Sequence, residues 1–434
     1  MDRVSLQGNS TERRIGIGLV GLGTAGGAFA RLIASNGEVW TRRFGVRVEL
    51  VRVGVSDLNK PRAVPAGLLV QGYREVLTDP AVDVVVELMG GVEQPHELIA
   101  AAIRAGKHVI TANKALIAES GDQLLALAHR HGVQLRFEAS VCGGIPVIKV
   151  IRESLSANRI RSLTGIVNGT TNYILTRMTQ AGASFAEALA EAQERGFAEA
   201  DPTLDVDGTD AVQKMAILSS LAFGGWCRYR DAMWDGIESV TAKDVVFAGM
   251  SGFIFKLVAM GRIIDGLTSV AVFPALVAED HPLAGVGDEF NAVLIDADFQ
   301  GPSVLIGRGA GGEPTASSVA ADLTDLLAGG AASEPAAAPR ELFPSEQLTF
   351  RYYFHFVTEN RPGIWAQVTG LLAEHGINIE SVHQKWEDPE QPSDLYVLVD
   401  PVAEQRARAA LDAIRTAPGI FSESRFYRIL PDGP

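Results

Sequence analysis

Between residues 199 and 214 the chain places five carboxylates ahead of a single lysine. The stretch GFAEADPTLDVDGTDAVQK carries, in order, Glu199, Asp201, Asp205, Asp207, Asp210 and Lys214. Acids this crowded repel one another, and a cation bound among them would relieve that repulsion. Asp210 and Lys214 are four residues apart in a segment with the apolar spacing of a helix, so they share one face. As an exposed pair they would contribute only about 0.3–0.5 kcal/mol, whereas a protonated lysine can serve as a general acid. Both interpretations stay open.

A second group of residues suited to chemistry is GLGTAG, at residues 21–26. It spells Gly21-x-Gly23-x-x-Gly26 directly after an apolar strand pattern and directly before a helical one. The first glycine permits a tight turn, and the second lets the backbone approach a pyrophosphate. The third lets helix and strand pack closely, while the helix N-terminus faces the negative charge. The pattern predicts a dinucleotide site that includes Thr24 and Ala25, and a tight turn without a ligand is the alternative.

The end of the second expected strand, GVSDLNKPR, should distinguish NAD from NADP. Asp57 could accept hydrogen bonds from the ribose hydroxyls, whereas Lys60 and Arg62 could pair with a 2′-phosphate. Asp57 lies further from the glycines than the usual spacing, and a solvated turn explains the segment about as well. The sequence therefore leaves the choice between NAD and NADP open.

The elements that must position these residues begin with an alternating segment over residues 1–139. Short apolar runs and helical patterns follow one another, which predicts an α/β domain with a Rossmann-type, doubly wound parallel sheet. The expected strands are 13–21, 46–57, 81–90, 106–113 and 133–140, and the expected helices are 25–37, 96–106 and 119–132. The sheet would place GLGTAG at the carboxyl end of its first strand.

After residue 139 the pattern changes. Residues 140–309 mix longer helical stretches with strand-like pieces, which predicts an α+β domain, and a helix over 310–327 closes it or returns to the first domain. Residues 328–348 are rich in Ala, Gly and Pro, as in a linker. Residues 349–434 alternate as βαββαβ, a ferredoxin-like unit of about 80 residues, large enough to fold on its own.

Composition narrows the classes of partner. A chain of 434 residues is expected to form two or three domains, and its net charge of -14 disfavours nucleic acid and anionic membranes. No apolar run approaches the ~20 residues that span a bilayer, and the first residues lack the apolar core of a signal peptide. Two cysteines provide neither a disulfide framework nor zinc spacing. We expect a cytoplasmic enzyme.

Several long motifs, taken in order, closely resemble those of homoserine dehydrogenases over residues 14–327. They are GLGTAG, TANKALIA, ASVCGGIPVI, NGTTNYIL, AEADPTLDVDGTDAVQK and GRGAGGEPTAS. The resemblance implies NAD(P)-dependent interconversion of L-aspartate 4-semialdehyde and L-homoserine, on the route to threonine, methionine and isoleucine. It also implies that the second domain binds substrate and forms the contacts of a homodimer or homotetramer.

The tail from about residue 349 resembles an ACT domain. VTENRPGIWAQV and INIESVHQ stand where that family carries its ligand turn and the following strand. The resemblance implies feedback by an amino acid, commonly threonine, and Asn360 and Gly363 are the candidate regulatory residues. NRPG carries asparagine where many ACT domains have aspartate, so a different ligand, no ligand or a plain dimerisation role stays open.

The resemblance also assigns roles to the acids and lysines. Asp210 and Lys214 would be the catalytic pair, with Lys214 protonating the oxygen of the aldehyde as hydride arrives. Glu199 and Asp205 would hold the ammonium of the substrate. Lys114 of TANKALIA follows a strand end, where ligands of such sheets bind. It would lie beside nicotinamide and substrate and is the rival proton donor, although an exposed lysine at a helix start is the alternative.

The remaining assignments concern glycine-rich motifs. Gly169 and Thr170 of NGTTNY would bind the substrate carboxylate at a helix start, although a plain helix cap explains the motif almost as well. Gly309 and Glu313 of GRGAGGEPTAS are further candidates for contacts with the cofactor. By resemblance, one carboxylate and three backbone carbonyls would bind a monovalent cation, usually sodium, and a simple glycine turn is the alternative. These four are Glu138, Val141, Gly143 and Ile145.

Two rival functions remain at this point. An acylating dehydrogenase acting on the same semialdehyde would use Cys142 as its nucleophile, but no histidine lies near Cys142 in the sequence. A non-catalytic amino-acid sensor would use the nucleotide fold and the C-terminal unit for binding only.

Overall fold

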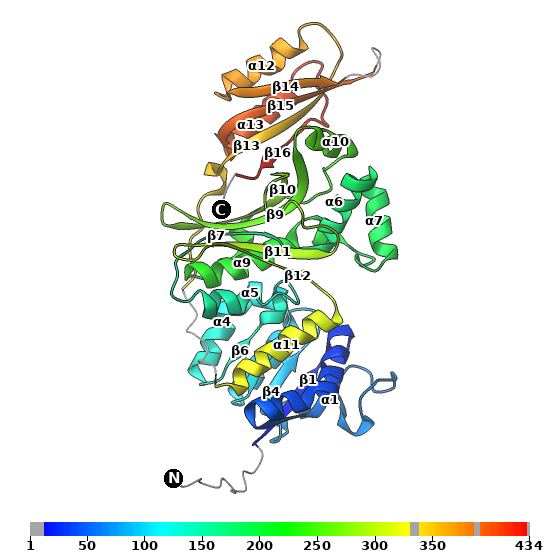
Figure 1. Ribbon diagram of the computed structural model, residues 1–434, viewed down its shortest axis with the longest axis vertical. Coiled ribbons are helices and arrows are strands. Elements are labelled where there is room, and N and C mark those ends of the chain that lie inside the picture. The colour runs from blue at the N-terminus through cyan, green and yellow to red at the C-terminus, as the bar shows by residue number, and fades with distance from the viewer. Residues whose placement is uncertain (1–12, 330–337, 386–390, 432–434) are drawn as a thin grey trace, which may run out of the picture. The chain divides into compact units, whose positions relative to one another are not determined.

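The computed structural model describes residues 13–329, 338–385 and 391–431 (Figure 1). Its contacts divide the chain into two compact units. The first comprises residues 1–149 and 310–338, and the second comprises residues 150–309 and 339–434. The domain boundaries expected from the sequence stay a prediction, and residues 330–337 of the expected linker lie outside the described residues.

The first unit is built on a parallel sheet of six strands in the order β3-β2-β1-β4-β5-β6. The strands are β1 (Arg13–Val20), β2 (Val46–Val55), β3 (Leu69–Gln71), β4 (Val84–Glu87), β5 (His108–Thr111) and β6 (Leu135–Arg136). The inner strands are runs of Val, Ile and Leu, and β4 is buried throughout, as expected for a sheet covered on both faces. This order and direction confirm the doubly wound sheet.

Helices cover this sheet. They are α1 (Thr24–Phe44), α2 (Arg74–Thr78), α3 (Glu93–Arg104), α4 (Lys114–Arg130), α5 (Val147–Lys149) and α11 (Gly312–Leu327). Helix α11 runs alongside α1, although nearly 270 residues separate them in the chain (Figure 1). The strand expected over 133–140 is wrong in its second half, because residues Glu138–Ser140 form a 3-10 turn. There the backbone N–H of Glu138 donates to the carboxylate of Asp322 instead of to a neighbouring strand.

The second unit is built on one mixed sheet in the order β12-β11-β7-β9-β10-β16-β13-β15-β14, with β8 also paired to β10. Its first strands are β7 (Ile160–Ile166), β8 (Met233–Trp234), β9 (Phe253–Ile264), β10 (Leu267–Ala278), β11 (Phe290–Ala297) and β12 (Gly301–Arg308). The helices of this part are α6 (Gly169–Ala181), α7 (Phe185–Glu194), α8 (Thr203–Val206), α9 (Thr209–Phe223) and α10 (Ala242–Met250). Helix α9 lies against β9 and β10 and carries the acid–lysine pair.

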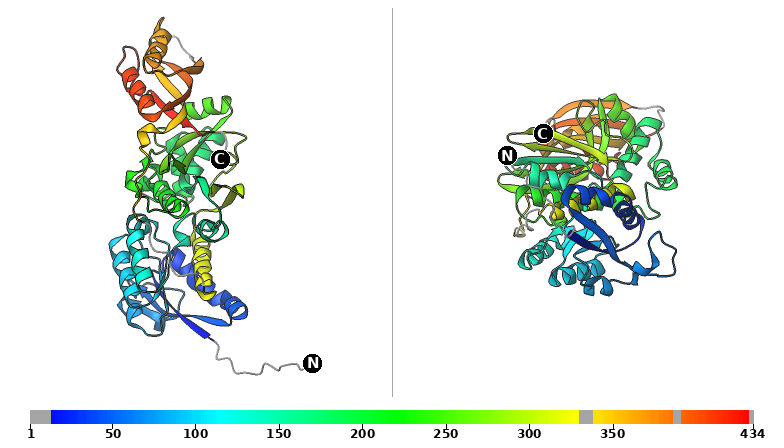
Figure 2. Two further views of the ribbon diagram at one scale, coloured as in Figure 1. Left: turned by 90° about the vertical axis from the view of Figure 1, so that its left-hand side faces the viewer. Right: turned by 60° about the horizontal axis from the view of Figure 1, so that its bottom comes forward.

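The C-terminal module, residues 349–431, has the expected βαββαβ order. It consists of β13 (Thr349–Thr358), α12 (Ile364–Glu374), β14 (Ile379–Lys385), β15 (Ser393–Ala403), α13 (Glu404–Arg415) and β16 (Arg425–Ile429). The two helices lie on the same face of these strands (Figure 2). Strand β16 pairs in parallel with β10, aligning Arg428 with Ala275. The module therefore extends the sheet that supports α9, which the sequence did not predict.

The hydrophobic core is continuous across this junction. Buried side chains of β9 and β10, such as Val258 and Phe273, belong to the same cluster as Phe350 and Leu372 of the C-terminal module. The rings of Phe273 and Phe350 meet edge to face with centroids 5.0 Å apart. The module is thus held by side-chain burial as well as by backbone hydrogen bonds.

A buried histidine also ties the module to α10. His355 of β13 places Nδ1 2.6 Å from Asp244 Oδ1 and Nε2 2.8 Å from Asp394 Oδ1. Arg425 donates to Asp244 Oδ2 at 2.9 Å, and Lys243 donates to Asp394 Oδ2 at 2.8 Å. Burial lowers the pKa of His355, but its two carboxylate partners outweigh burial and raise that pKa above its ordinary value. The two acids therefore favour the charged form of the imidazole.

This arrangement predicts a pH-dependent contribution to stability. Because the folded pKa of His355 is raised, its stabilisation is complete below the ordinary value of 6.5 and is lost as pH rises through the folded value. A His355→Gln variant, which leaves buried acids without their cation, should lose about 3 kcal/mol of unfolding free energy near pH 6. The loss should shrink toward pH 9. Urea unfolding at pH 6 and pH 9 measures the difference in unfolding free energy between the variant and the wild type, with His375→Gln as the control. An equal difference at the two pH values would contradict the raised pKa of His355.

Candidate active site

The acid–lysine pair lies buried at the start of α9. Lys214 is 8% exposed and Asp210 3% exposed. The ammonium of Lys214 donates to Asp210 Oδ2 at 2.7 Å and to the backbone carbonyl of Val167 at 2.7 Å. An exposed surface pair is therefore excluded. The ammonium is fixed from two sides, by its own helix and by the residue that follows β7.

Asn168 connects this pair to a second acid. Its Nδ2 donates to Asp205 Oδ1 at 2.7 Å and to Asp210 Oδ2 at 2.9 Å. Its Oδ1 accepts from the backbone N–H of Thr171 at 2.8 Å, which caps α6. One side chain therefore starts a helix and holds two carboxylates together. Asn168 was not among the predicted site residues, although its place before Gly169 in NGTTNY is the signal of an N-cap.

The surroundings make Asp205 a poor place for an isolated charge. Burial raises the pKa of Asp205 above its ordinary value, and the neighbouring Asp210 adds to that rise. The hydrogen bond from Asn168 and the positive charge of Lys214 act in the opposite direction. A cation beside Asp205 would favour its charged form. Binding of a positively charged ligand beside Asp205 would therefore stabilise its ionised carboxylate.

Two of the other acids accept local hydrogen bonds from residues two positions ahead, and the third, Glu199, is exposed. Asp201 accepts from the N–H and hydroxyl of Thr203 at the start of α8, and Asp207 accepts from the N–H of Thr209 at the start of α9. Glu199 is exposed, and its backbone carbonyl accepts from Gln193. Its role in holding the ammonium stays a prediction.

The helix start in NGTTNY is closely packed. A Cβ on Gly169 would lie 2.8 Å from the backbone oxygen of Glu289, so only glycine fits there without a shift. The hydroxyl of Thr170 donates to the carbonyl of Phe197 at 2.8 Å. Both residues stand next to Asn168 at the N-terminus of α6, where backbone N–H groups and the helix dipole favour an anion.

In the first unit the three glycines meet three different demands. Gly21 has φ +95°, and a Cβ there would lie 2.4 Å from the carbonyl of Leu88. A Cβ on Gly26 would lie 2.0 Å from the carbonyl of Gly21, so helix and strand need this glycine to pack. A Cβ on Gly23 would meet no described atom within 4 Å, which leaves its backbone open to a ligand. The loop therefore fits a pyrophosphate as the signature predicts.

Two helix N-termini meet at this loop. Helix α1 begins at Thr24, followed by Ala25, and has no side-chain cap. Helix α11 begins at Gly312, also without a side-chain cap, and a Cβ on Gly312 would lie 3.0 Å from the carbonyl of Thr24. Two adjacent helix starts supply more N–H donors and positive potential than one does. This juxtaposition is consistent with a cofactor role for the GRGAGGEPTAS motif.

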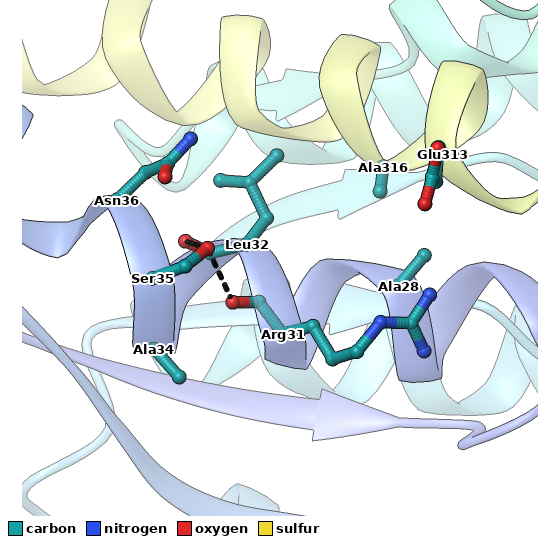
Figure 3. Close-up of a pocket in the computed structure, with 8 residues that line it drawn as sticks. All are labelled: Ala28, Arg31, Leu32, Ala34, Ser35, Asn36, Glu313 and Ala316. Atoms are coloured by element: carbon teal, nitrogen blue, oxygen red, sulfur yellow. Dashed lines mark hydrogen bonds between the residues drawn. The ribbon is translucent and has the colours of Figure 1, made fainter.

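The two candidate cofactor residues of that motif, Gly309 and Glu313, have no hydrogen bond to the glycine loop among the described residues. A Cβ on Gly309 would lie 2.1 Å from the side chain of Asn291, so packing alone accounts for this glycine. Glu313 is exposed and lines a cavity of about 650 Å³ between α1 and α11, facing the helix that carries Arg31 (Figure 3). This cavity lies along the sides of the helices beyond the glycine loop. The assignment of both residues to the cofactor stays a prediction.

After β2, one of the three candidates approaches the glycine loop. Arg62 donates to the carbonyl of Leu22 at 3.0 Å and to that of Asp57 at 3.4 Å. Its Nε is buried and has no hydrogen-bond partner among the described residues. The carboxylate of Asp57 accepts from the backbone N–H of Asn59 at 2.8 Å, and Lys60 is exposed. The guanidinium, rather than the acid, is therefore aimed at the loop.

At the carboxyl ends of β4 and β5 lie Glu87 and Lys114. Lys114 is the first residue of α4, directly after the cap Asn113, and it is half-buried. Glu87 is fully buried, and its carboxylate accepts from the N–H of Met89 at 2.6 Å and contacts the hydroxyl of Thr111 at 2.5 Å. Burial raises the pKa of Glu87 to about 7. Both residues border the edge of the sheet where nucleotide ligands bind.

The candidate cation residues form a compact oxygen-rich turn. Cys142 and Gly143 both have positive φ, of 55° and 47°. The carboxylate of Glu138 accepts from the N–H groups of residues 148 and 149, at 2.9 and 2.7 Å. The carbonyl of Gly143 accepts from Ser318 at 2.5 Å, and that of Ile145 from residue 147 at 2.8 Å. Carboxylate and carbonyl oxygens are the ligands that hard cations prefer, so the donor types of this turn are compatible with such an ion.

Comparison with known proteins points to one family along nearly the whole chain. Family models described as homoserine dehydrogenase NAD binding domain, homoserine dehydrogenase, and ACT domain match residues 21–138, 146–324 and 356–419. The homoserine dehydrogenase of Pseudomonas aeruginosa is 41% identical over 418 residues, covering 93% of this chain and 96% of that protein. A homoserine dehydrogenase crystal structure from Thiobacillus denitrificans has a TM-score of 0.91 at 39% identity, covering 96% and 98% of the two chains. The chain belongs to the homoserine dehydrogenase family.

Membership of the homoserine dehydrogenase family confirms the resemblance seen in the sequence, and with it an oxidoreductase that has an NAD-binding domain and an ACT domain. A hyperthermophilic archaeal homoserine dehydrogenase in complex with NADPH has a TM-score of 0.62 at 27% identity, covering 74% of this chain and 100% of that one. No helix among the described residues is long and apolar enough to cross a bilayer. No group of three or more metal-binding side chains occurs among them either.

The family assignment disfavours the two rival functions. Cys142 is 1% exposed, which suits a packed turn better than a nucleophile that must reach a substrate.

In the ACT domain, Asn360 is exposed and Gly363 has φ +88° at the start of α12. Arg361 braces this turn by donating to Glu359 at 2.9 Å and to the carbonyl of Pro418 at 3.0 Å. The regulatory role of the turn stays a prediction.

The raised pKa of Glu87 predicts that this buried acid opposes stability at neutral pH. The folded group ionises near pH 7 and the unfolded one near 4.5. Stability is therefore lost as pH rises from 4.5 through 7, by about 3 kcal/mol in all. A Glu87→Gln variant, which resembles the protonated acid, should gain on the wild type in melting temperature from pH 5 to pH 8.

The control for this comparison is Glu97→Gln, on the outer side of α3. Its carboxylate is exposed and accepts from Tyr73 at 3.4 Å. It should show no such trend. A constant difference between Glu87→Gln and the wild type over this pH range would contradict the shift.

Proposed function

We propose that this chain catalyses the reversible NAD(P)H-dependent reduction of L-aspartate 4-semialdehyde to L-homoserine. The observation that carries the proposal is the buried ammonium of Lys214, held at 2.7 Å by both Asp210 and the carbonyl of Val167. It lies in a chain that belongs to the homoserine dehydrogenase family. A buried, oriented cation beside two carboxylates is suited to an amino-acid substrate whose carbonyl oxygen becomes negative during reaction.

The residues of the second unit divide the work on the substrate. Asp205, with Glu199 as the second candidate, accepts hydrogen bonds from the substrate ammonium. The N–H groups at the start of α6, at Gly169 and Thr170, receive the carboxylate. Lys214 then donates its proton to the alkoxide oxygen, and Asp210 keeps the ammonium charged and aimed until that moment. A bound reduced nicotinamide supplies the hydride. Lys114 stays the rival proton donor.

We propose NADPH as the preferred cofactor. The support comes from Arg62, whose guanidinium reaches the glycine loop and donates to the carbonyl of Leu22 at 3.0 Å. A guanidinium at the end of β2 pairs with the 2′-phosphate that distinguishes NADP from NAD. The carboxylate of Asp57, which would bind a free 2′-hydroxyl, is instead engaged with the N–H of Asn59.

Three further proposals extend the family assignment. A homodimer or homotetramer is the proposed assembly, and threonine is the proposed effector at the turn containing Asn360 and Gly363. Sodium is the proposed ion at the turn of Glu138, Val141, Gly143 and Ile145. It would balance the negative charge of Glu138 next to Asp322, whose burial, with that charge, raises its pKa well above the ordinary value.

A Lys214→Ala variant tests the proposed reaction. Loss of the general acid should lower kcat at least about 100-fold with little change in the KM of the cofactor. Because homoserine oxidation needs Lys214 to accept a proton, wild-type kcat in that direction should rise from pH 7 to pH 10. Absorbance at 340 nm with homoserine and NADP+ or NAD+ measures both.

The matched control is Lys243→Ala, because Lys243 is an exposed lysine of the same unit. It should retain wild-type kcat. Full activity of Lys214→Ala, or a flat oxidation profile, would remove Lys214 as the proton donor and would favour Lys114. Absence of any turnover by the wild type with homoserine would contradict the reaction itself.

An Arg62→Gln variant tests the cofactor proposal. Loss of the paired charge should raise the KM of NADPH about tenfold, because a charge-assisted contact is worth about 1.5–3 kcal/mol. The KM of NADH should change much less. Arg104→Gln, on α3 of the same unit, serves as the control. Equal effects on both cofactors, or a wild type that prefers NADH, would assign Arg62 a structural role only.

A further inference from the structure

The turn that carries Asp205 and Asp210 is supported from behind by another segment. Here the turn means residues 205–210, from the end of α8 to the start of α9, and the support means residues 234–237, which begin with the last residue of β8. The N–H of Ile237 donates to the carbonyl of Val206 at 2.8 Å. A Cβ on Gly236 would lie 2.2 Å from the same carbonyl, so the two backbones touch.

A second close approach between the turn and the support lies at Gly208. Gly208, the residue before α9, has φ +86°, and a Cβ there would lie 3.2 Å from the carbonyl of Asp235. Any displacement of the support therefore moves the backbone between the two acids. Protein interiors packed at this density transmit such shifts because no void absorbs them.

The support is in turn held by two elements. The N–H of Asp235 donates to the carbonyl of Val272 on β10 at 2.8 Å. The carboxylate of Asp235 lies 2.8 Å from the guanidinium of Arg428 on β16, and 3.4 Å from that of Arg408 on α13. Both arginines belong to the C-terminal module. Asp235 thus joins the support to that module through two ion pairs.

Arg428 is itself rigidly placed. It is 2% exposed, and it donates from two nitrogens to the carboxylate of Glu404, at 2.9 and 2.5 Å. Its guanidinium lies over the rings of Phe273 and Phe426, with centroid distances of 4.8 and 5.4 Å. A planar guanidinium stacked and paired in this way has one orientation. It therefore defines where the Asp235 carboxylate stands.

We propose that Asp235 is a positioning residue for the amino-acid substrate. Through Arg428 it links the C-terminal module to the support, and through the support it sets the distance between Asp205 and Asp210. The proposal rests on the proposed function, because it assumes that these acids hold substrate. Movement of the C-terminal module relative to β10 would reach the two acids by this route.

The side chain of Asp235 is suited to a test because it is 39% exposed. An Asp235→Asn change keeps the shape and removes the charge, and Arg428 keeps its fork to Glu404, so the fold should survive. The KM of homoserine should rise about fivefold or more, since small misplacements of binding groups have large effects. The KM of NADP+ should stay within about twofold, because the glycine loop belongs to the other unit.

The kcat should change less than the KM of homoserine, because Lys214 is also anchored to Val167, outside the turn. Asp235→Glu restores the charge and should recover most of the lost affinity. Lys243→Met is the matched control, since it breaks the 2.8 Å pair with Asp394 that joins the C-terminal module at α10 instead of at Asp235. It should leave both KM values unchanged.

The outcomes separate this inference from the function on which it rests. A wild type without homoserine turnover would overturn both. A wild type that is active, with an Asp235→Asn variant that keeps its KM for homoserine, would overturn the positioning role alone. A loss shared equally by homoserine and NADP+, or reproduced by Lys243→Met, would show a general loosening of the fold and would also overturn it.

Discussion

The second unit is organised around one ammonium that must stay charged out of water. Lys214 is buried, so its charge is costly unless Asp210 and the carbonyl of Val167 both remain within 2.7 Å. That requirement fixes α9 against the end of β7. Asn168 adds the next contacts. Its Oδ1 accepts from the N–H of Thr171 at the start of α6, and its Nδ2 donates to Asp205 and Asp210. Helices α6 and α9 are therefore positioned by the same contacts that hold the ammonium of Lys214.

Local patterns predicted the parts of this site that lie within one turn of chain. The four-residue spacing of Asp210 and Lys214 and the three glycines of GLGTAG express helix and turn geometry directly, and the structure places them as expected. Asp201 and Asp207 show the limit of such patterns. In the sequence these two acids stand among the candidate site residues. In the structure, however, their carboxylates accept hydrogen bonds from the backbone N–H groups two residues ahead.

Contacts between distant segments could not be predicted in this way. Asn168 and Asp205 are 37 residues apart, and nothing in either motif states that they meet. Arg62 reaches Leu22 across 40 residues because β2 lies beside β1, which follows from the fold and not from the local sequence. The pairing of β16 with β10 is the largest case. The βαββαβ order of the C-terminal module was predicted, but its edge strand has no local mark of a second partner.

That pairing changes what the C-terminal module can do. A module joined only by a flexible linker would act on the enzyme by association alone. Here its strands continue the sheet beneath α9, its core is shared with β10, and its buried ions are paired with residues of the preceding domain. Buried ion pairs add little net stability compared with apolar contacts, but they allow few orientations. His355 and Arg428 therefore serve to fix one docking geometry, and a change in that geometry is expressed as a shift of the backbone behind Asp205 and Asp210.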